Sequence, residues 1–403
     1  MADDLETATG IGDLIAEAMH SRQRLPAADE VRRTLHLRPD QRDLTVGQWL
    51  DLWLDSRRAL RPTTRRGYED ITRIHLVPHL GAGKLARLTA DHITAMFDAI
   101  IARNDAIAVS RAVPRSAGGR RDLRSERPVG PAQLRRIHAV LRAALNHAVQ
   151  RQLLPHNPAI GVELPSARSP RPLVWTRQRV AEWQRTGTVP SPVMVWTAEH
   201  TGRFLDHVSS DPLYVMFHLM ALRGLRRGEA CGLHRGDVDL DTQTLTVRHQ
   251  IVLVGWQPGL SAPKTDGSEA TIALDTTTAE LLRQQLADQD RMQEQAGTGW
   301  IENGLLFTEP DGRAIHPDWV SRRFRTAVNE AGLPPIRLHD LRHGAATLAL
   351  AAGADIKTVQ AMLRHSTITL TANTYTSVLP AVAHHAAEAA AALIPRAHGG
   401  EPA

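Results

Sequence analysis

The chain has 403 residues, more than one hydrophobic core usually organises, so we expect at least two domains. Hydrophobic residues make up 42% of it and charged residues 23%, as in ordinary globular proteins. No stretch reaches the ~18 to 20 apolar residues that span a bilayer, and the acidic start MADDLETATG does not resemble a signal peptide. The single cysteine, Cys231, excludes an intramolecular disulfide and a multi-cysteine zinc site. The composition predicts a cytoplasmic protein.

The net charge of +5 is unevenly distributed along the chain. Residues 1–44 carry a net charge of −3, residues 45–172 carry +11, and residues 173–403 carry −3. A basic block of about a domain's length indicates a polyanionic partner, of which nucleic acid is the commonest. The alternative is a basic, solvated surface in a protein that uses arginine freely.

The N-terminal part of the chain is predicted to be helical. Residues 1–44 have weak periodicity and are interpreted as an appendage, partly disordered. Apolar residues then recur at helical spacing in four segments of residues 45–155. These helices are expected after Thr45, over about 63–78, from near Thr89 and over about 131–154. Residues 111–130 contain five arginines before Arg127 and three glycines, which indicates a mobile basic loop.

A proline-rich segment separates this block from a mixed domain. The linker is predicted over residues 156–190, because residues 155–172 contain five prolines. Residues 191–380 are predicted to form a second domain, with helices near 198–209 and 211–223, strands at 244–249, 250–256 and 269–274, and mostly helix after Thr278. An alanine-rich helix (381–394) and a tail end the chain, in the segment 381–403. The predicted fold class is multidomain: an all-α basic domain followed by a mainly helical α+β domain with a small antiparallel sheet.

Several residues that could carry chemistry fall into short clusters. The first cluster is RGLRRGEACGL, which begins at Arg223 and contains Arg226 and Glu229. The second is His339-Asp-Leu-Arg342-His343, whose positions i, i+3 and i+4 share one helix face. The third is Leu363-Arg364-His365-Ser366, and Tyr375 follows ten residues after His365. Lys264 lies in a predicted turn between two strands, and it is one of only three lysines against 45 arginines. An isolated lysine in such a chain is a hint of a role that needs a removable proton.

The order of these motifs resembles the tyrosine recombinases, and within them the phage and plasmid integrases. The resemblance rests on G-L-R-x-x-E, a lysine on a turn, H-x-x-R-H, H-S and a tyrosine ten residues later, and it covers roughly residues 190–380. It implies that residues 45–155 are a DNA-binding core-binding domain and that residues 191–380 are a catalytic domain of the tyrosine recombinase type.

The resemblance also implies a role for each residue of the site. Arg226 and Arg342 would neutralise the phosphorane oxygens, work that suits guanidiniums because they stay charged and present a fork of donors. His339 and His365 would bond the phosphate or handle the proton of the nucleophile. Lys264 would protonate the departing 5′ oxygen, and Tyr375 would be the nucleophile that forms a 3′-phosphotyrosyl enzyme. No metal, ATP or other cofactor is expected.

The remaining residues of the clusters receive supporting or structural interpretations. Glu229 is expected to orient Arg226, and His343 to support the pocket by packing or hydrogen bonding. His339 and His343 could instead be an i,i+4 metal pair, although the sequence offers no third ligand. The arginines Arg223, Arg227 and Arg364 are interpreted as solvated or as contacts to the DNA backbone. Further residues are interpreted as structural: Cys231 as core, Tyr68 and Tyr214 as packing, and Asp340 as a helix cap.

The sequence therefore predicts a site-specific DNA recombinase, an integrase, associated with the bacterial nucleoid. Its expected partners are double-stranded DNA with attachment-type sites, three further copies of the chain in a tetramer, and an accessory directionality or DNA-bending protein. The sequence departs from the family pattern at Arg364, where glycine is usual, and at Glu269, where a basic residue is usual. Three alternatives stay open: a type IB topoisomerase-like relaxing enzyme, a non-catalytic DNA-binding protein, and a metal-dependent nuclease that uses the histidines.

Overall fold

The computed structural model describes residues 44–112, 126–166, 170, 172–261, 270–364, 388 and 391–392. The chain separates into two compact units, residues 1–168 and 169–403. Several predictions lie outside the described residues: the appendage up to residue 43, the centre of the basic loop (113–125), and the C-terminal helix apart from three residues. The finer domain boundaries at residues 155 and 190 stay predictions.

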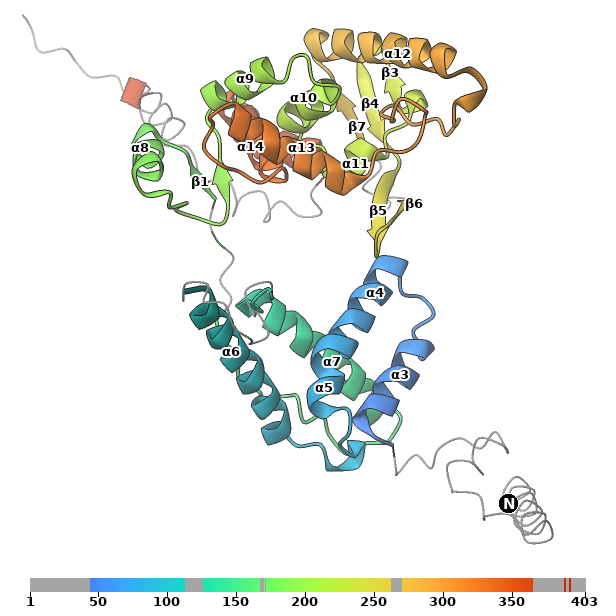
Figure 1. Cartoon of the computed structure of the whole chain (residues 1–403), viewed down its shortest axis with the longest axis vertical. Helices are drawn as coiled ribbons and strands as arrows, with labels where there is room; N and C mark the ends of the chain where they lie inside the picture. The colour runs from blue at the N-terminus through green and yellow to red at the C-terminus, as the bar shows by residue number, and fades with distance from the viewer. Residues whose placement is uncertain are drawn as a thin grey trace, which may run out of the picture. The chain divides into compact units, whose positions relative to one another are not determined.

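The described part of the first unit is built from helices (Figure 1). Its α-helices are α3 (Val46–Ser56), α4 (Pro62–Ile71), α5 (Val77–Leu80), α6 (Ala90–Ala112) and α7 (Pro131–Gln150). A capping box starts α3, because the Thr45 hydroxyl accepts a bond from the Gln48 N–H while the Gln48 side chain accepts one from the Thr45 N–H. The four predicted helical segments are confirmed.

A π-helical turn at Thr72–Leu76 joins α4 to α5, so the predicted helix over 63–78 runs through an irregular middle. Pro78 explains the irregularity. Its ring cannot donate a backbone hydrogen bond and crowds the carbonyl one turn earlier, and a local widening of the helix relieves both problems.

Each of the helices α3 to α7 contributes buried residues to the core of the first unit. Trp49 and Trp53 of α3 are almost completely buried, and the Trp49 indole N–H donates to the Ala144 carbonyl oxygen at 3.1 Å. Tyr68 stacks on Trp53 with the two ring centroids 5.5 Å apart, so the packing role predicted for this tyrosine is confirmed.

The second unit combines helices with short strands. Its α-helices are α8 (Arg177–Thr186), α9 (Ala198–His207), α10 (Tyr214–Arg223), α11 (Arg227–Cys231), α12 (Thr276–Ala296), α13 (Pro317–Glu330), α14 (Asp340–Ala351) and α15 (Ile356–Leu363). Its strands are β1 (Leu173–Val174), β2 (Met194–Val195), β3 (Val238–Asp239), β4 (Thr244–Val247), β5 (Gln250–Val254), β6 (Gln257–Ser261) and β7 (Ala270–Ala273). Figure 1 shows α9, α10, α13 and α14 as one group of helices beside the strands.

The strands form three small sheets. A three-stranded antiparallel sheet has the order β3-β4-β7, with Leu245 opposite Ile272. The strands β5 and β6 form an antiparallel hairpin, and β1 pairs with β2 in parallel. The predicted strands at 244–249, 250–256 and 269–274 are confirmed in β4, β5 and β7, whereas β1, β2, β3 and β6 were not predicted.

Aromatic side chains fill the centre of the second unit. Phe204 and Phe324 lie 5.1 Å apart between ring centroids, and Trp196 contacts both rings. Cys231 and Tyr214 also belong to this packing, as predicted. Among the described residues, no helix is long and apolar enough to cross a membrane.

Candidate active site

Arg226 lies immediately before α11, where two glycines allow other segments to come close. Gly224 ends α10 with a φ of +63°, and a Cβ at this position would lie 2.6 Å from Cδ2 of Leu363 on α15. A Cβ on Gly228 would lie 2.6 Å from the carbonyl oxygen of Ile251 on β5. The glycines of the first cluster therefore let α15 and β5 pack around the backbone that carries Arg226.

Glu229 holds Arg226 in the way the sequence predicts. The Arg226 guanidinium donates to Glu229 Oε1 at 2.5 Å, and the Arg226 backbone N–H donates to Oε2 at 2.8 Å. Burial opposes ionisation of this carboxyl, but the charges of Arg364 and Arg226 and the bonds from Arg226 keep its pKa below the ordinary value. Glu229 is thus an ionised, buried anchor, while the Arg226 side chain keeps 38% of its surface exposed.

Arg342 reaches the same place from α14. Its guanidinium donates to the Gly224 carbonyl oxygen at 2.5 Å and also to the carbonyl oxygen of Leu363, the last residue of α15. Arg342 is almost completely buried, with 3% of its surface exposed. Helix ends leave carbonyl oxygens without partners inside the helix, so the C-terminus of α15 is a natural acceptor for such a guanidinium.

The two histidines of the second cluster differ in exposure. His339 is exposed, yet partial desolvation and the charges of Arg342, Arg337 and Arg226 lower its pKa. His343 is half-buried, and burial is the main cause that lowers its pKa to about 4. Their rings meet edge to face with centroids 5.7 Å apart. Both imidazoles are therefore neutral at pH 7, and His343 packs against His339.

Asp340 does not cap the helix as expected. It lies within the first turn of α14, and its buried carboxylate accepts bonds from the backbone and guanidinium of Arg337. The residue before it, His339, occupies the N-cap position without a side-chain capping bond.

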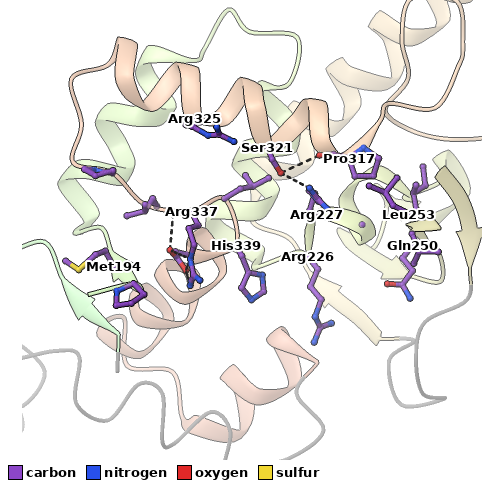
Figure 2. A pocket seen from close by; sticks show the side chains of 18 of the residues that line it. Met194, Arg226, Arg227, Gln250, Leu253, Pro317, Ser321, Arg325, Arg337 and His339 are labelled. Atoms are coloured by element: carbon purple, nitrogen blue, oxygen red, sulfur yellow. Dashed lines mark hydrogen bonds and ion pairs between the residues drawn. The ribbon is translucent and has the colours of Figure 1, made fainter. Parts of the chain in front are cut away.

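A cavity of about 920 Å³ opens beside these residues. Figure 2 shows Arg226 and His339 extending toward the same side of it from different elements. Three further arginines line the cavity: Arg227, Arg325 and Arg337. Arg227 donates to Asp318 and Ser321 of α13, whereas Arg325 is exposed and makes no hydrogen bond or ion pair within the described residues. The cavity presents excess positive charge suited to a phosphodiester.

The burial of Arg364 contradicts the prediction that this residue is solvated or contacts the DNA backbone. It ends α15 in the left-handed region, with a φ of 53°, and its side chain has no exposed surface. Its guanidinium donates to Glu229 Oε2 at 2.6 Å and to the Met362 carbonyl oxygen at 3.0 Å. The contact joins residues 135 positions apart, which explains why no local pattern could reveal it.

The other two arginines of that group are also paired. Arg223 forms an ion pair with Asp275, and Arg227 forms one with Asp318 at 2.7 Å. The Arg223 side chain is 21% exposed and that of Arg227 is 37% exposed. Sequence reasoning also missed Arg325 and Arg337, for which the only signal was their basic character near the second cluster.

Three of the predicted catalytic residues, Lys264, His365 and Tyr375, lie outside the described residues. His365 directly follows Arg364 in the chain, so the described part of the site ends at the residue before it.

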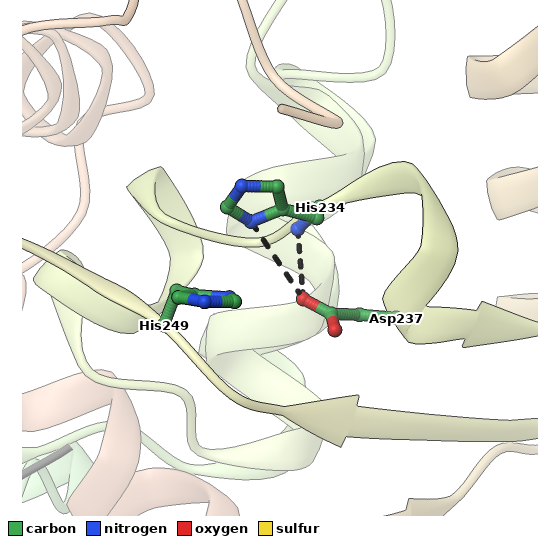
Figure 3. A group of neighbouring side chains, drawn as sticks. All are labelled: His234, Asp237 and His249. Carbon is green, nitrogen blue, oxygen red and sulfur yellow. Dashed lines mark hydrogen bonds and ion pairs between the residues drawn. The ribbon is translucent and has the colours of Figure 1, made fainter. Parts of the chain in front are cut away.

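One group of side chains has the composition of a metal site. Ligand atoms of His234, Asp237 and His249 lie within 4.8 Å of one another (Figure 3). However, one Asp237 oxygen accepts from the Arg248 guanidinium at 2.9 Å, and the other accepts from the His234 backbone N–H at 2.9 Å. Because both oxygens are used and a cation adjoins them, we interpret this group as a structural hydrogen-bonded cluster. The predicted alternative pair, His339 and His343, belongs to no group of three metal-ligand residues among those described.

Comparison with known proteins assigns the family. The sequence pattern of the phage integrase family matches residues 197–381, and that of the phage integrase N-terminal SAM-like domain matches residues 45–99. The chain belongs to the phage integrase family. The resemblance stated from the motifs is confirmed.

Proteins with sequences similar to this chain are named as tyrosine recombinases or integrases. A tyrosine recombinase XerC-like protein of Caldanaerobacter subterraneus subsp. tengcongensis is 26% identical over 259 residues, which cover 61% of this chain and 62% of the relative. The integrase of Mycobacterium phage D29 is 27% identical over 240 residues, covering 59% of this chain and 56% of the relative. The matches thus span about three fifths of these relatives.

Solved structures confirm the fold class. The Tn1549 transposon integrase, in complex with transposon right end DNA, matches with a TM-score of 0.61 and 18% identity over 86% of this chain and all of the other. A lambda integrase tetramer bound to a Holliday junction matches with a TM-score of 0.56 and 16% identity over 90% of this chain and 84% of the other. At these identities the likeness concerns the fold, an all-helical domain followed by a mainly helical α+β domain.

Proposed function

We propose that this protein is a site-specific DNA recombinase that cuts and rejoins DNA strands through a 3′-phosphotyrosyl intermediate. One observation carries the proposal: Arg226 and Arg342, which lie 116 positions apart in the chain, are both directed to the end of α15. Arg342 donates to the Leu363 carbonyl oxygen, and Arg226 Nη2 lies 3.5 Å from that of Arg364. The next residue is His365, so three motifs of the sequence meet at one point beside a basic cavity.

The proposed chemistry assigns each described side chain a task. The guanidinium of Arg226, which lines the cavity, and the positive charge of Arg342, which is buried behind it, neutralise the charge that builds on the non-bridging phosphate oxygens as the phosphorane forms. Their positions are held before DNA binds, by Glu229 for Arg226 and by two carbonyl oxygens for Arg342. His339 is neutral at pH 7, because its pKa is lowered, and a neutral imidazole can donate to a phosphate oxygen or accept a proton.

The remaining steps belong to residues outside the described part. The phenolic oxygen of Tyr375 attacks phosphorus and transfers its proton to an imidazole, that of His339 or His365, while the bond from phosphorus to the 5′ oxygen breaks and Lys264 protonates that oxygen. The reverse reaction with the 5′ hydroxyl of a second strand rejoins the DNA. Because the guanidiniums and the lysine supply the charge and the proton, the proposed reaction uses neither a metal ion nor ATP.

The proposed reaction also implies the partners of the protein. The substrate is duplex DNA with attachment-type sites, and the active assembly is a tetramer of this chain on two duplexes. The solved lambda integrase tetramer on a Holliday junction supports this assembly. An accessory directionality or DNA-bending protein completes the proposal, which places the protein at the bacterial nucleoid.

A nicked suicide duplex tests the proposed reaction. The duplex is first selected from a randomised pool by binding to the Tyr375→Phe chain, and a nick beside the cleavage position then lets the 5′ end diffuse away. We expect the wild-type chain to form a covalent protein–DNA adduct that survives denaturation, and Tyr375→Phe to form none. An adduct of equal yield in both chains, or cleavage that excess chelator abolishes, would contradict the proposal.

A second assay separates recombination from relaxation. Two duplexes with different end labels are incubated with the wild-type chain, and supercoiled plasmid bearing the same site is incubated in parallel. We expect joined products that carry both labels. Relaxed plasmid without any doubly labelled product would instead support the type IB topoisomerase-like alternative.

A further inference from the structure

The end of α15 contains an arginine where its backbone favours glycine. Arg364 has a φ of 53° and a ψ of 46°, the left-handed conformation in which non-glycine residues are uncommon. Its guanidinium is fully buried, and one nitrogen of the side chain, Nε, has no hydrogen-bond partner. A buried cation in an unfavourable backbone conformation persists only where its surroundings stabilise it strongly, and here the stabilising group is Glu229.

Glu229 is shared between two guanidiniums. Arg226 donates to Oε1 from its guanidinium and to Oε2 from its backbone, and Arg364 donates to Oε2 at 2.6 Å. The three side chains together carry a net charge of +1. If residue 364 were glycine, the ion pair of Arg226 and Glu229 alone would carry no net charge.

The excess charge is available only on the side of the cavity. The Arg364 side chain is fully buried, Glu229 is 6% exposed, and the Arg226 side chain is 38% exposed and lines the cavity. A phosphate in the cavity would therefore contact the guanidinium of Arg226. Arg364, on the buried side of Glu229, competes with Arg226 for the Glu229 carboxylate. A carboxylate shared in this way attracts Arg226 less strongly, which leaves more of its charge for the phosphate.

We propose that Arg364 is a positioning residue that offsets Glu229, so that Arg226 meets the scissile phosphate as an uncompensated cation. Arg364 does not reach the cavity and acts only through Glu229. This inference rests on the proposed recombinase function and adds to it a residue that sets the charge of the site.

Charge-balanced variants test the proposal on the nicked suicide duplex at saturating DNA. Arg364→Gly relieves the backbone but leaves Arg226 neutralised, and we expect single-turnover adduct formation to slow by about tenfold. That loss is smaller than the ~10²–10³-fold cost of deleting a donor to the transition state. The double variant Arg364→Gly with Glu229→Gln has the original net charge of +1, and its glutamine oxygen can still accept from Arg226. We expect its rate to return to within about threefold of wild type.

Two further chains serve as controls. Arg364→Lys keeps the charge without the fork of donors, and we expect a rate between those of wild type and Arg364→Gly. Arg291→Gln with Asp288→Asn removes an exposed ion pair of α12 that does not involve Arg226, and we expect less than a twofold change. Thermal melting of each variant reports folding separately.

The outcomes distinguish the inference from the proposed function. A double variant as slow as Arg364→Gly, or more than tenfold below wild type where the single variant does not fold, would show that Arg364 has only a structural role. A wild-type chain that forms no Tyr375-dependent adduct would overturn the proposed function, and this inference with it. Rescue of the rate by Glu229→Gln in the glycine background supports both.

Discussion

Arg342 and Arg226 are held by different kinds of hydrogen-bond acceptor, and this difference predicts the effect of substituting Arg342. Arg226 has a charged anchor in Glu229, whereas Arg342 donates to two backbone carbonyl oxygens, those of Gly224 and Leu363. Two carbonyl acceptors at different places require the fork geometry of a guanidinium. The residue type at position 342 is therefore constrained by packing as well as by charge.

Replacement of Arg342 by lysine tests this constraint. An ammonium is a point charge on a flexible stem and cannot donate along two fixed directions to both carbonyl oxygens. We expect Arg342→Lys to lower the rate of adduct formation by about 10²-fold, with DNA affinity nearly unchanged. Single-turnover cleavage and a binding titration measure the two effects, and a rate within threefold of wild type would contradict the assignment.

His343 predicts how stability changes with pH. Its pKa is about 4 in the folded chain and near 6.5 in the unfolded chain, so between these values the unfolded state binds more protons. The free energy of unfolding should therefore decrease as the pH falls through this window, by about 2 kcal/mol between pH 7 and pH 5 from this residue. Urea unfolding of wild type and His343→Gln at both pH values isolates the contribution. An equal loss in both chains would contradict the lowered pKa.

Helices and strands with a clear periodicity of apolar residues could be predicted from the sequence. The helices of residues 45–155, α9, α10 and the strands β4, β5 and β7 have apolar residues at their own period, and each was found near its predicted position. The helix α8 (Arg177–Thr186) was not predicted, because it lies in the segment interpreted as a linker. The two-residue strands β1 and β2 are too short to show a period, and β6 (QPGLS) contains a proline and a glycine that disfavour strands. These strands depend on pairing with partners, which is tertiary information.

The candidate site was predictable to a similar degree. Motif order identified Arg226, His339 and Arg342, which the structure brings to the end of α15 or the adjoining cavity. The burial of Arg364 was not predictable, because its partner Glu229 belongs to a distant cluster and its backbone conformation depends on both.

The close contact between α15 and Gly224 predicts the effect of adding a side chain at position 224. Alanine at 224 would adopt a positive φ and place its Cβ 2.6 Å from Leu363, so α15 and the acceptor of Arg342 would have to move. We expect Gly224→Ala to destabilise the chain by about 3 kcal/mol, from the left-handed backbone and the clash together, and to slow cleavage.

Gly187→Ala is the matched control for this change. Gly187 has a φ of +71° at the end of α8, but a Cβ there would meet nothing within 4 Å. We expect it to cost about 1–2 kcal/mol and to leave the cleavage rate unchanged. Denaturant unfolding and adduct formation measure both variants, and equal effects of the two on cleavage would contradict the role of the Gly224 contact.

For the whole molecule, the main feature is the division of labour between a basic helical unit and a unit that carries the site. The positive charge is concentrated in residues 45–172, and α7 carries exposed arginines at 135 and 136. Arginine–phosphate contacts release counterions, so DNA affinity should depend strongly on salt.

Replacement of the two α7 arginines tests the proposed contact. We expect Arg135→Gln with Arg136→Gln to reduce the slope of log affinity against log salt concentration by about two. Arg185→Gln, which removes an exposed arginine paired with Glu182, is the control and should leave the slope unchanged. Fluorescence anisotropy at several salt concentrations measures the slopes, and identical slopes in all three chains would exclude α7 as a phosphate-contacting surface.

Mass spectrometry of the trapped adduct identifies the bond between protein and DNA directly. The adduct is digested with nuclease and protease, and the modified peptide is sequenced. We expect one modified residue, Tyr375, linked to a 3′-phosphate with a free 5′ hydroxyl on the released strand. A nucleotide attached to any other residue, or a linkage to a 5′-phosphate, would contradict it.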